Sequence, residues 1–416
     1  MNIYIIIIGW SLTLACAGLT VLWIAAWLTI RAGNKTASTV EDGLSWEPSD
    51  NKGGKNNNEN YPAVSIVIPA HNEEAMIAEA LESIRRSNYP GRLEIIIVAD
   101  RCTDTTTTIV RKQVAADSRV KLIEVDSCPP DWSGKCHSCW QGYQQTTGEI
   151  LLFTDADTLF HPDLIRASVG YLKKRNLDFL SLLGRLRCHY NFEKTSQPIA
   201  ALALMRMYPI AKANIQKNGR MRRPFANGQF MLFTRSTYEN AGTHQRVKNA
   251  ILEDLRFAGR LSRQGRRMGL TTSGNLFTVR MYETEEQFNR GWKRIFTEGA
   301  SRNIPRLQAS AMRLRLLGLG PILSLMTTIY GGFISKDNPP LGSVTIIAGL
   351  VSFILFIFIM RLVYRMQGAR TSYLFRFPVG CFRVASIFKE AINDLKQGRG
   401  IEWAQLHYHV DAVEEE

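Results

Sequence analysis

Three long stretches of the chain are apolar and carry no charged side chain. They cover residues 3–30, 316–334 and 339–360, and a short polar segment separates the second stretch from the third. A helix needs about 20 apolar residues to cross a bilayer. We therefore predict a membrane helix near the N-terminus and a membrane hairpin late in the chain. Glycines and Pro321 in the second stretch leave a re-entrant or interfacial segment as its alternative.

The first apolar stretch has a second interpretation, a cleaved signal peptide with Cys16 near its cleavage site. No basic segment precedes the stretch, and it is longer than the roughly 7 to 15 residues of a signal core, so a retained anchor is favoured. The basic residues that flank the three stretches are Arg31, Lys35, Arg313, Arg315, Arg361 and Arg365. Because such residues favour the cytoplasmic side, we expect a multi-pass protein of the plasma or inner membrane whose bulk is cytoplasmic.

The pattern between the apolar stretches changes twice. Residues 33–60 are polar and rich in Asn, Lys, Gly and Ser, which predicts a flexible linker over residues 32–61. Short apolar segments then alternate with helical patterns, and the expected strands are residues 64–68, 94–98, 120–125 and 149–154. This alternation predicts an α/β fold with a mostly parallel sheet and helices on both faces. A strand over residues 225–234 and a helix over residues 253–264 are also expected.

The charge balance indicates an anionic partner. The chain has 51 Lys and Arg against 37 Asp and Glu, a formal net charge of +14. It contains no recognisable nucleic-acid module, so we expect no nucleic acid as a partner. Basic residues are dense beside the apolar stretches, which favours the headgroups of a lipid bilayer. Residues 373–392 mix basic and apolar side chains and are typical of a segment on the membrane surface, with a helix packed on the globular part as the alternative.

The seven cysteines are an odd number in a chain whose bulk is expected in the cytoplasm, so we predict free thiols. Cys136 and Cys139 have the CxxC spacing, with Cys128 and His137 nearby. A zinc or redox site is therefore an alternative for this segment. No second CxxC completes a zinc ligand set, which makes that alternative the weaker one.

Carboxylates stand at three places where a predicted strand or loop passes into a helix. They are Asp100, the pair Asp155 and Asp157, and the pair Glu253 and Asp254. Open α/β sheets bind ligands at the carboxyl ends of their strands. Two hard oxygen donors one residue apart can share a divalent cation, and that cation can hold a diphosphate. Together these carboxylates outline a site for a metal-bound nucleotide sugar.

Five motifs occur in a familiar order: residues 64–74 (VSIVIPAHNEE), 98–106 (VADRCTDTT), 154–157 (TDAD), 253–254 (ED) and 287–292 (QFNRGW). In this order they resemble the inverting glycosyltransferases of the GT-A fold, family two. The resemblance is strongest to membrane-anchored members that glycosylate lipids, such as ceramide glucosyltransferases and hopanoid- and carotenoid-associated enzymes. It implies a GT-A nucleotide-sugar-binding domain and a hexosyltransferase (EC class 2.4) that moves a sugar, with inversion, from a nucleotide diphosphate sugar, expected to be a UDP-sugar, to a membrane lipid.

The resemblance also implies roles for individual residues. Asp254 would be the general base that takes the proton of the acceptor hydroxyl. Asp155 and Asp157 would bind Mg²⁺ or Mn²⁺, which acts as a Lewis acid on the departing diphosphate. The residues implied to contact the donor are Pro69, His71, Glu73, Asp100, Lys135, Asp155, Gln287, Arg290 and Trp292. For these residues, a helix cap, an acidic first turn or a solvent-facing charge is the structural alternative.

The last motif departs from the family's Q-x-x-R-W because Gly291 stands between Arg290 and Trp292. In processive synthases that motif grips the acceptor sugar and the diphosphate, so the altered form favours transfer of a single sugar. A polysaccharide synthase and a non-catalytic nucleotide-sugar-binding scaffold are the alternatives. The expected organisation is an N-terminal anchor (1–31), a linker (32–61), a GT-A domain (62–305), a membrane hairpin (314–363) and a cytoplasmic or interfacial segment (364–416).

Overall fold

The computed structural model describes residues 3–36, 38–48, 60–207, 213–217, 220–399, 401–403 and 406–408. The chain divides into two compact units. The sheet unit comprises Ala37–Leu186 and Tyr208–Met281, and the membrane-helix unit comprises Met1–Thr36, Arg187–Met207 and Tyr282–Glu416. The range expected for one GT-A domain, residues 62–305, is thus shared by the two units.

A seven-stranded sheet forms the centre of the sheet unit, with the strand order β11-β6-β10-β4-β1-β2-β3. The strands are β1 Val64–Ala70, β2 Leu93–Asp100, β3 Val120–Val125, β4 Ile150–Thr154, β6 Phe179–Leu183, β10 Phe230–Thr234 and β11 Met268–Thr272. β10 runs antiparallel to β4 and β6, and the other neighbours are parallel. The predicted mostly parallel α/β sheet is therefore confirmed, and the four expected strands correspond to β1 to β4.

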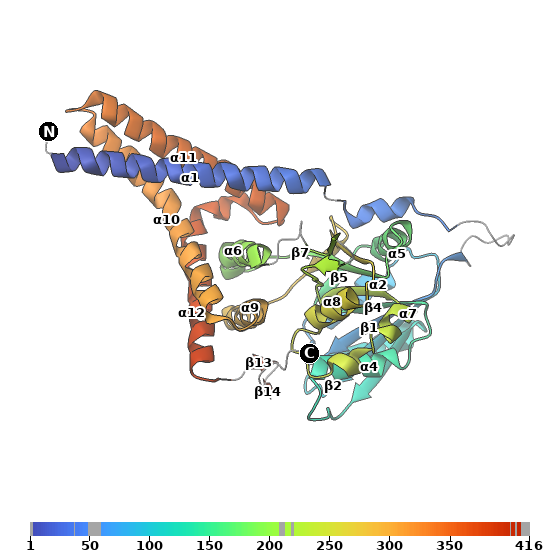
Figure 1. The fold of residues 1–416 in the computed structure, drawn as a ribbon. Helices are drawn as coiled ribbons and strands as arrows, with labels where there is room; N and C mark the ends of the chain where they lie inside the picture. Colours follow the sequence, from blue (N-terminus) through green and yellow to red (C-terminus); the bar gives the residue numbers. More distant parts are fainter. Residues whose placement is uncertain are drawn as a thin grey trace. The chain divides into compact units, whose positions relative to one another are not determined.

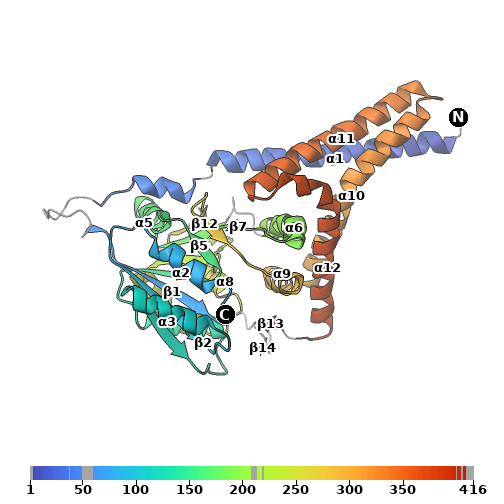
Figure 2. The same cartoon turned by 180° about the vertical axis from the view of Figure 1, so that it is seen from behind.

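Alternating apolar positions along these strands fill a core on each face of the sheet, as strand geometry requires. Ile66 and Ile68 pack on the face covered by α2 (Ile77–Arg85), α3 (Thr106–Ala116) and α5 (Leu164–Lys174). Val67 packs on the opposite face with α4 (Gly134–Tyr143), α7 (Arg235–Asn240) and α8 (Glu253–Arg263). Figures 1 and 2 show the two faces from opposite sides. Both faces are thus covered by helices.

Shorter elements complete the sheet unit. A three-stranded sheet has the order β5-β12-β7, and β8 pairs with β9. Their bounds are β5 Thr158–Phe160, β7 Arg185–Leu186, β8 Ile215–Lys217, β9 Arg220–Arg222 and β12 Phe277–Val279, and the short helix η4 is His244–Val247. The strand expected over residues 225–234 begins only at Phe230, so residues 225–229 are a loop that leads into β10.

Part of the predicted linker is folded. Residues 38–48 contain the short helix η1 (Val40–Ser45), which packs on α5 so closely that a Cβ on Gly43 would lie 1.9 Å from the Ala167 backbone oxygen. Val40 is fully buried, and Trp46 meets Tyr61 edge to face. The prediction of a flexible linker is wrong for this segment because a few apolar side chains in the polar stretch are enough to hold it on the domain. Residues 49–59 lie outside the described residues.

Three helices of the membrane-helix unit are long and apolar enough to cross a membrane. They are α1 (Ile3–Thr36), α10 (Ile304–Ile334) and α11 (Pro339–Met366), and they lie side by side (Figures 1 and 2). Gly349 lets α11 approach α10, because a Cβ there would lie 2.7 Å from the Ser324 backbone oxygen. α10 is helical throughout, including Pro321. These helices indicate association with a membrane.

The remaining helices of this unit form a packed group. They are α6 (Asn191–Met207), α9 (Glu285–Gly299), η5 (Thr371–Arg376) and α12 (Phe377–Lys396), and a hairpin of β13 (Ile401–Trp403) and β14 (Leu406–Tyr408) follows. α12 contacts α6, α9 and α10, and Phe388 stacks on Phe296 with ring centroids 4.1 Å apart. The mixed segment over residues 373–392 is therefore packed along one side. Phe375, Val379 and Phe382 remain exposed.

Candidate active site

Asp100, Asp155 and Asp157 lie at the carboxyl ends of two strands of the sheet unit, β2 and β4. Asp100 is the last residue of β2, and Asp155 and Asp157 come directly after β4. β1 lies between these two strands and is parallel to both. Parallel strands bring their carboxyl ends to one edge of the sheet, which is where α/β folds bind ligands.

Lys135 forms ion pairs with carboxylates from two of the three predicted places, Asp155 and Glu253. It lies in the first turn of α4, which begins after the N-cap Ser133. Its Nζ is 2.7 Å from Asp155 Oδ1 and 2.8 Å from Glu253 Oε1, and only 17% of the lysine side chain is exposed. Burial by itself lowers the pKa of Lys135, but Asp155 and Glu253 outweigh it and hold the pKa well above its usual range. The lysine is therefore a fixed positive charge within a carboxylate cluster.

The main chain at Gly228 lies directly beside this cluster. A Cβ at this position would lie 3.1 Å from Glu253 Oε1, 3.2 Å from Lys135 Nζ and 3.3 Å from Asp254 Oδ2. The glycine lies in the loop before β10, so the main chain approaches all three charged groups without a side chain between them. Such close backbone approach is a recurrent reason for glycine at a ligand site.

Asp254 is held by backbone donors at the start of α8. The Gly228 N–H donates to its Oδ2 at 2.8 Å, and the Leu255 N–H donates to its Oδ1 at 2.7 Å. Desolvation and the neighbouring Glu253 carboxylate raise the pKa of Asp254 to about 7, although Lys135 and the backbone donors oppose the shift. A carboxylate with a pKa near neutrality is suited to accept a proton in general base catalysis.

Asp157 has a buried oxygen without a partner. Its Oδ1 accepts no hydrogen bond from any residue that the structure describes. Desolvation, Asp155 and Glu73 raise the pKa of Asp157 well above its usual range. Unsatisfied buried carboxylate oxygens are costly, and a cation is one way to satisfy them. The loop after β1, which carries Glu73, therefore contributes negative charge to the same region.

The carboxylates fit a divalent cation that is shared with a substrate. No three His, Cys, Asp or Glu side chains within the described parts of the chain converge into a complete metal cluster. Mg²⁺, however, usually takes one or two carboxylates from the protein and completes its shell with water and substrate phosphates. Asp155 and Asp157 provide hard oxygen donors of this kind. The donor set therefore fits a cation that binds together with a diphosphate.

The side chains of Asp100 and the next residue, Arg101, form a clamp of two hydrogen bonds. Arg101 Nε donates to Asp100 Oδ1 at 2.7 Å, and Arg101 Nη2 donates to Asp100 Oδ2 at 2.8 Å. Arg101 has a φ of +48°, a left-handed conformation that costs a non-glycine residue about 1 to 2 kcal/mol. A Cβ on Gly134 would lie 2.7 Å from this Arg101 nitrogen, so the glycine makes room for the pair. The two side chains together present carboxylate acceptors of Asp100 beside guanidinium donors of Arg101 in a fixed position.

The remaining predicted residues of the sheet unit lie on β1 and its following loop. Pro69 is the penultimate residue of β1 and is half-buried. His71 Nδ1 lies 2.6 Å from the Asp100 backbone oxygen, so the ring is tied to the end of β2. The Glu73 N–H donates to the Thr106 hydroxyl at 2.8 Å. These residues are therefore held beside Asp100 by contacts between the two loops.

The motif at residues 287–292 lies in the membrane-helix unit. Helix capping and packing explain the positions of most of its residues. Gln287 completes a capping box with Thr284 at the start of α9. Trp292 is buried, and its Nε1 donates to Gln197 Oε1 at 3.1 Å. Gly291 leaves space for the Tyr282 ring, whose hydroxyl would lie 2.4 Å from a Cβ there. Arg290 is exposed. Donor contact by these residues stays a prediction.

The structure places three further residues in the site, and the sequence analysis predicted none of their contacts. Glu253, which the sequence places in an acidic pair, is the second partner of Lys135 and is buried. Arg101 and Gly228 had no expected role. The sequence signal for Gly228 was a glycine inside an apparent strand, which often marks close backbone approach. No local signal indicates that Arg101 folds back on Asp100.

The CxxC segment is part of a hydrophobic core. Cys136 and Cys139 are buried among the side chains between the sheet and α4, and the Cys136 thiol donates to the Val247 backbone oxygen at 3.3 Å. All seven cysteines are free, as predicted. This packing favours a structural role for the two thiols.

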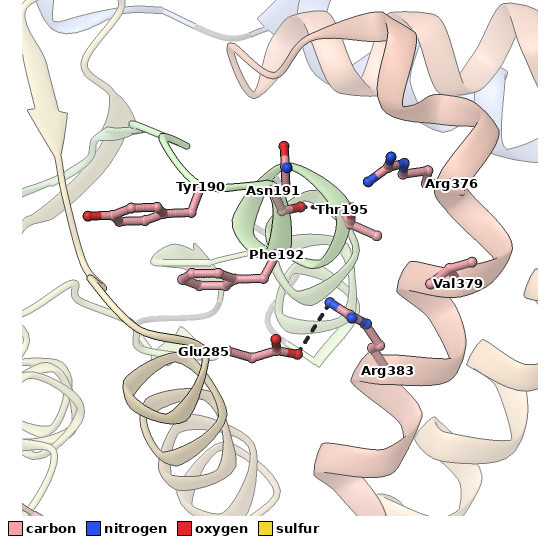
Figure 3. A pocket seen from close by; sticks show the side chains of 8 residues that line it. All are labelled: Tyr190, Asn191, Phe192, Thr195, Glu285, Arg376, Val379 and Arg383. Carbon is pink, nitrogen blue, oxygen red and sulfur yellow. Dashed lines mark hydrogen bonds and ion pairs between the residues drawn. The ribbon is translucent and has the colours of Figure 1, made fainter.

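A cavity of about 520 Å³ lies within the membrane-helix unit (Figure 3). It is lined by Tyr190, Asn191, Phe192, Thr195, Glu285, Arg376, Val379 and Arg383. Arg383 pairs with Glu285 at 3.2 Å, and Arg376 lies over the Tyr373 ring. None of the residues that line it was predicted as a site residue.

The chain is similar in sequence to curated glycosyltransferases and can be compared with one solved structure. Two curated proteins named 4,4'-diaponeurosporenoate glycosyltransferase, from Staphylococcus aureus strains MRSA252 and USA300, are 26% and 25% identical to the chain over 275 residues, which is 65% of this chain and 71% of theirs. A solved mannosyltransferase of Pyrobaculum calidifontis, in complex with GDP-Man and Mn²⁺, is 19% identical and covers 90% of this chain and 98% of its own, with a TM-score of 0.45.

The family itself follows from a match to a sequence model. Residues 62–296, more than half of the chain, match the model described as Glycosyltransferase like family 2. The match begins just before β1 and ends within α9, so it contains the mostly parallel GT-A-like sheet and every predicted site residue. Because this match covers more than half of the chain, the chain belongs to glycosyltransferase family 2 and is a glycosyltransferase.

Proposed function

We propose that this enzyme transfers one sugar, with inversion, from a UDP-sugar to an acceptor lipid in the membrane, with the sheet unit on the cytoplasmic side. The observation that carries the proposal is the cluster of Asp155, Lys135, Glu253 and Asp254 at the edge of the sheet. It combines a candidate base, a fixed cation and carboxylates suited to a metal within one small region. That is the set of groups that displacement of a diphosphate by a hydroxyl requires.

Asp254 is the proposed general base. Its oxygens are oriented by the Gly228 and Leu255 N–H groups, and a pKa of about 7 lets the deprotonated form accept a proton near neutrality. Taking the proton from the acceptor hydroxyl makes the oxygen a stronger nucleophile as it attacks the anomeric carbon. Attack from the face opposite the diphosphate inverts the configuration at that carbon.

Asp155 and Asp157 are the proposed ligands of Mg²⁺ or Mn²⁺. The unpartnered Oδ1 of Asp157 supports this assignment. When bound, the cation supplies Lewis-acid stabilisation of negative charge on the leaving diphosphate. Lys135 adds a second positive charge at the amino end of α4, where the helix dipole also favours a phosphate group.

The clamp formed by Asp100 and Arg101 is the proposed nucleobase contact. It offers carboxylate acceptors beside guanidinium donors in a fixed geometry. The edge of uracil that presents an N–H between carbonyl groups matches such a pair, whereas the corresponding edge of cytosine lacks that N–H. His71 and Pro69 border the same loop and complete the proposed nucleoside contact, as does Glu73.

A membrane lipid is the proposed acceptor. Three helices are suited to cross a membrane, and the relatives from Staphylococcus aureus are named for transfer to 4,4'-diaponeurosporenoate. Covalent attachment to membrane helices raises the local concentration of membrane acceptors around the enzyme, as tethering does for linked binding sites. The basic residues Arg31, Arg313 and Arg361 at the ends of the apolar stretches support a cytoplasmic sheet unit.

The proposal is tested by supplying the purified full chain in lipid nanodiscs with UDP-glucose, Mn²⁺ or Mg²⁺ and a membrane lipid extract. Mass spectrometry of the lipids is expected to show a product that is one hexose heavier, formed by the wild type and lost in the Asp254→Asn variant. A ladder of many sugars would indicate a polysaccharide synthase instead. UDP binding without transfer or hydrolysis of any tested sugar donor would favour the non-catalytic scaffold.

A further inference from the structure

Lys135 occupies a position that a metal ion would also favour. Its ammonium group is within 2.8 Å of carboxylate oxygens on both Asp155 and Glu253. Gly228 brings Asp254 to the same point, because one Cβ position there lies within 3.3 Å of both Lys135 Nζ and Asp254 Oδ2. The lysine therefore offsets part of the negative charge of the cluster in the donor-free enzyme.

The lysine and a divalent cation compete for Asp155. The proposed metal ligands include this carboxylate, whose Oδ1 is already bound to Lys135. Two cations on one carboxylate repel each other strongly in a partly buried site, where charges are poorly screened. The ammonium group must therefore move from Asp155 when a cation binds there. Lysine is suited to such movement because its charge sits on a flexible four-carbon chain.

We propose that Lys135 is a resident counter-ion that exchanges with the metal. It holds Asp155 and Glu253 in the donor-free enzyme, leaves Asp155 when the metal and the donor bind together, and then pairs with the donor diphosphate. This inference rests on the proposed function and adds to it how the binding of the metal and the binding of the donor are coupled. The metal binds weakly until the diphosphate offers the lysine a new partner, so metal and donor bind cooperatively.

Reciprocal coupling gives this exchange a measurable signature. If the diphosphate relieves competition between Lys135 and the metal, UDP strengthens Mn²⁺ binding and Mn²⁺ strengthens UDP binding by the same factor. Removing the lysine charge removes the competition. A Lys135→Met variant is therefore expected to bind Mn²⁺ about tenfold more tightly than the wild type in the absence of UDP, within the usual range of such couplings.

The test measures Mn²⁺ binding to the full chain in detergent by electron paramagnetic resonance, with and without UDP. Wild type, Lys135→Met and Lys121→Met are compared, since the half-exposed Lys121 side chain forms an ion pair with Glu94 at 3.5 Å outside the cluster. Lys121→Met is expected to behave as the wild type. In Lys135→Met, tighter Mn²⁺ binding without UDP and a smaller effect of UDP support the exchange. Mn²⁺ binding that is unchanged or weaker without UDP overturns it.

Thermal stability provides a second measurement, which also covers a variant that folds poorly. Losing Lys135 removes the cation that pairs with the buried Glu253 and the half-buried Asp155, so the melting temperature of Lys135→Met is expected to fall and to recover when Mn²⁺ alone is added. A melting temperature that Mn²⁺ raises no more than in the wild type contradicts the exchange. The readout is independent of transfer: a chain that shows the exchange but transfers no sugar refutes the proposed function only, and an active chain without the exchange refutes this inference only.

Discussion

The carboxylate cluster of the sheet unit and the motif on α9 of the membrane-helix unit look alike in the sequence, since both are short polar motifs of the same family. In the structure they differ. The cluster keeps charged groups together with an unpartnered oxygen on Asp157, whereas the α9 motif uses Gln287 as a helix cap and buries Trp292 against Gln197.

This difference separates residues held ready for a ligand from residues already satisfied by the protein. Buried polar groups are normally paired, so an unpaired oxygen or a crowded cluster of like charges marks a site that something else completes. A capped and packed residue needs no ligand to explain it. Substitutions in the cluster are therefore expected to lower the turnover number, and substitutions in the α9 motif are expected to lower the free energy of unfolding.

The largest effect is expected for Asp254→Asn. Loss of a general base lowers the turnover number by about 100-fold to 10,000-fold. Because the amide keeps the shape of the side chain, the affinity for UDP is expected to stay within about twofold of the wild type. Steady-state kinetics and calorimetric UDP titration measure the two quantities. Asp337→Asn, at an exposed position between α10 and α11, is the matched control. Turnover above a tenth of the wild-type value would remove Asp254 from the mechanism.

Trp292→Ala is expected to act on stability. Truncating a buried tryptophan costs about 3 to 5 kcal/mol of unfolding free energy, and the hydrogen bond that Trp292 donates to Gln197 is also lost. Thermal or chemical unfolding in detergent measures the loss, and Trp10→Ala, where the side chain is 49% exposed, is the control. UDP affinity of the folded fraction is expected to be unchanged. A weakened affinity with unchanged stability would restore donor contact as the role of this tryptophan.

The pH dependence of turnover sharpens the role of Asp254. Its pKa of about 7 means that the carboxylate becomes protonated below neutrality, so turnover is expected to fall about tenfold per pH unit well below pH 7. Linkage gives the sign for stability: because the folded pKa lies above the usual 3.8, the contribution to stability is fully present below pH 3.8 and is lost as the pH rises through about 7. A rate profile that stays flat from pH 5 to 8 would exclude this carboxyl as the titrating base.

The smallest effect is expected for Gln287→Ala. Its side chain accepts from the backbone N–H groups of Glu283 and Thr284, so the substitution removes half of the capping box and costs about 1 kcal/mol of unfolding free energy. Glu286→Ala, at an exposed neighbouring position, is the control. The Michaelis constant for the donor is expected to be unchanged for both variants. An increase of tenfold in Gln287→Ala alone would show that this residue contacts the donor.

Local patterns in the sequence predicted the strands of the central sheet, the helices suited to a membrane and the strand ends at which Asp100, Asp155 and Asp157 lie. β1 to β4 and the start of α8 lie where the local patterns placed them, and the three predicted apolar stretches lie within α1, α10 and α11, although α10 begins earlier, at Ile304. Two segments differ from this pattern. Residues 38–48 fold because Val40 finds a buried site on a partner far along the chain, and residues 225–229 form a loop although their apolar character resembles a strand.

The sequence by itself determined which chemical groups are present, the order of the family motifs and the ends of strands from which the carboxylates emerge. Only the tertiary structure decided which charges meet: Lys135 and Glu253 are 118 positions apart, and nothing local to either predicts their ion pair of 2.8 Å. It also decided that Trp292 is packed and that Asp157 keeps an open oxygen. The physical reason is that periodicity and capping act between near neighbours, whereas pairing and burial depend on which distant segments the fold brings together.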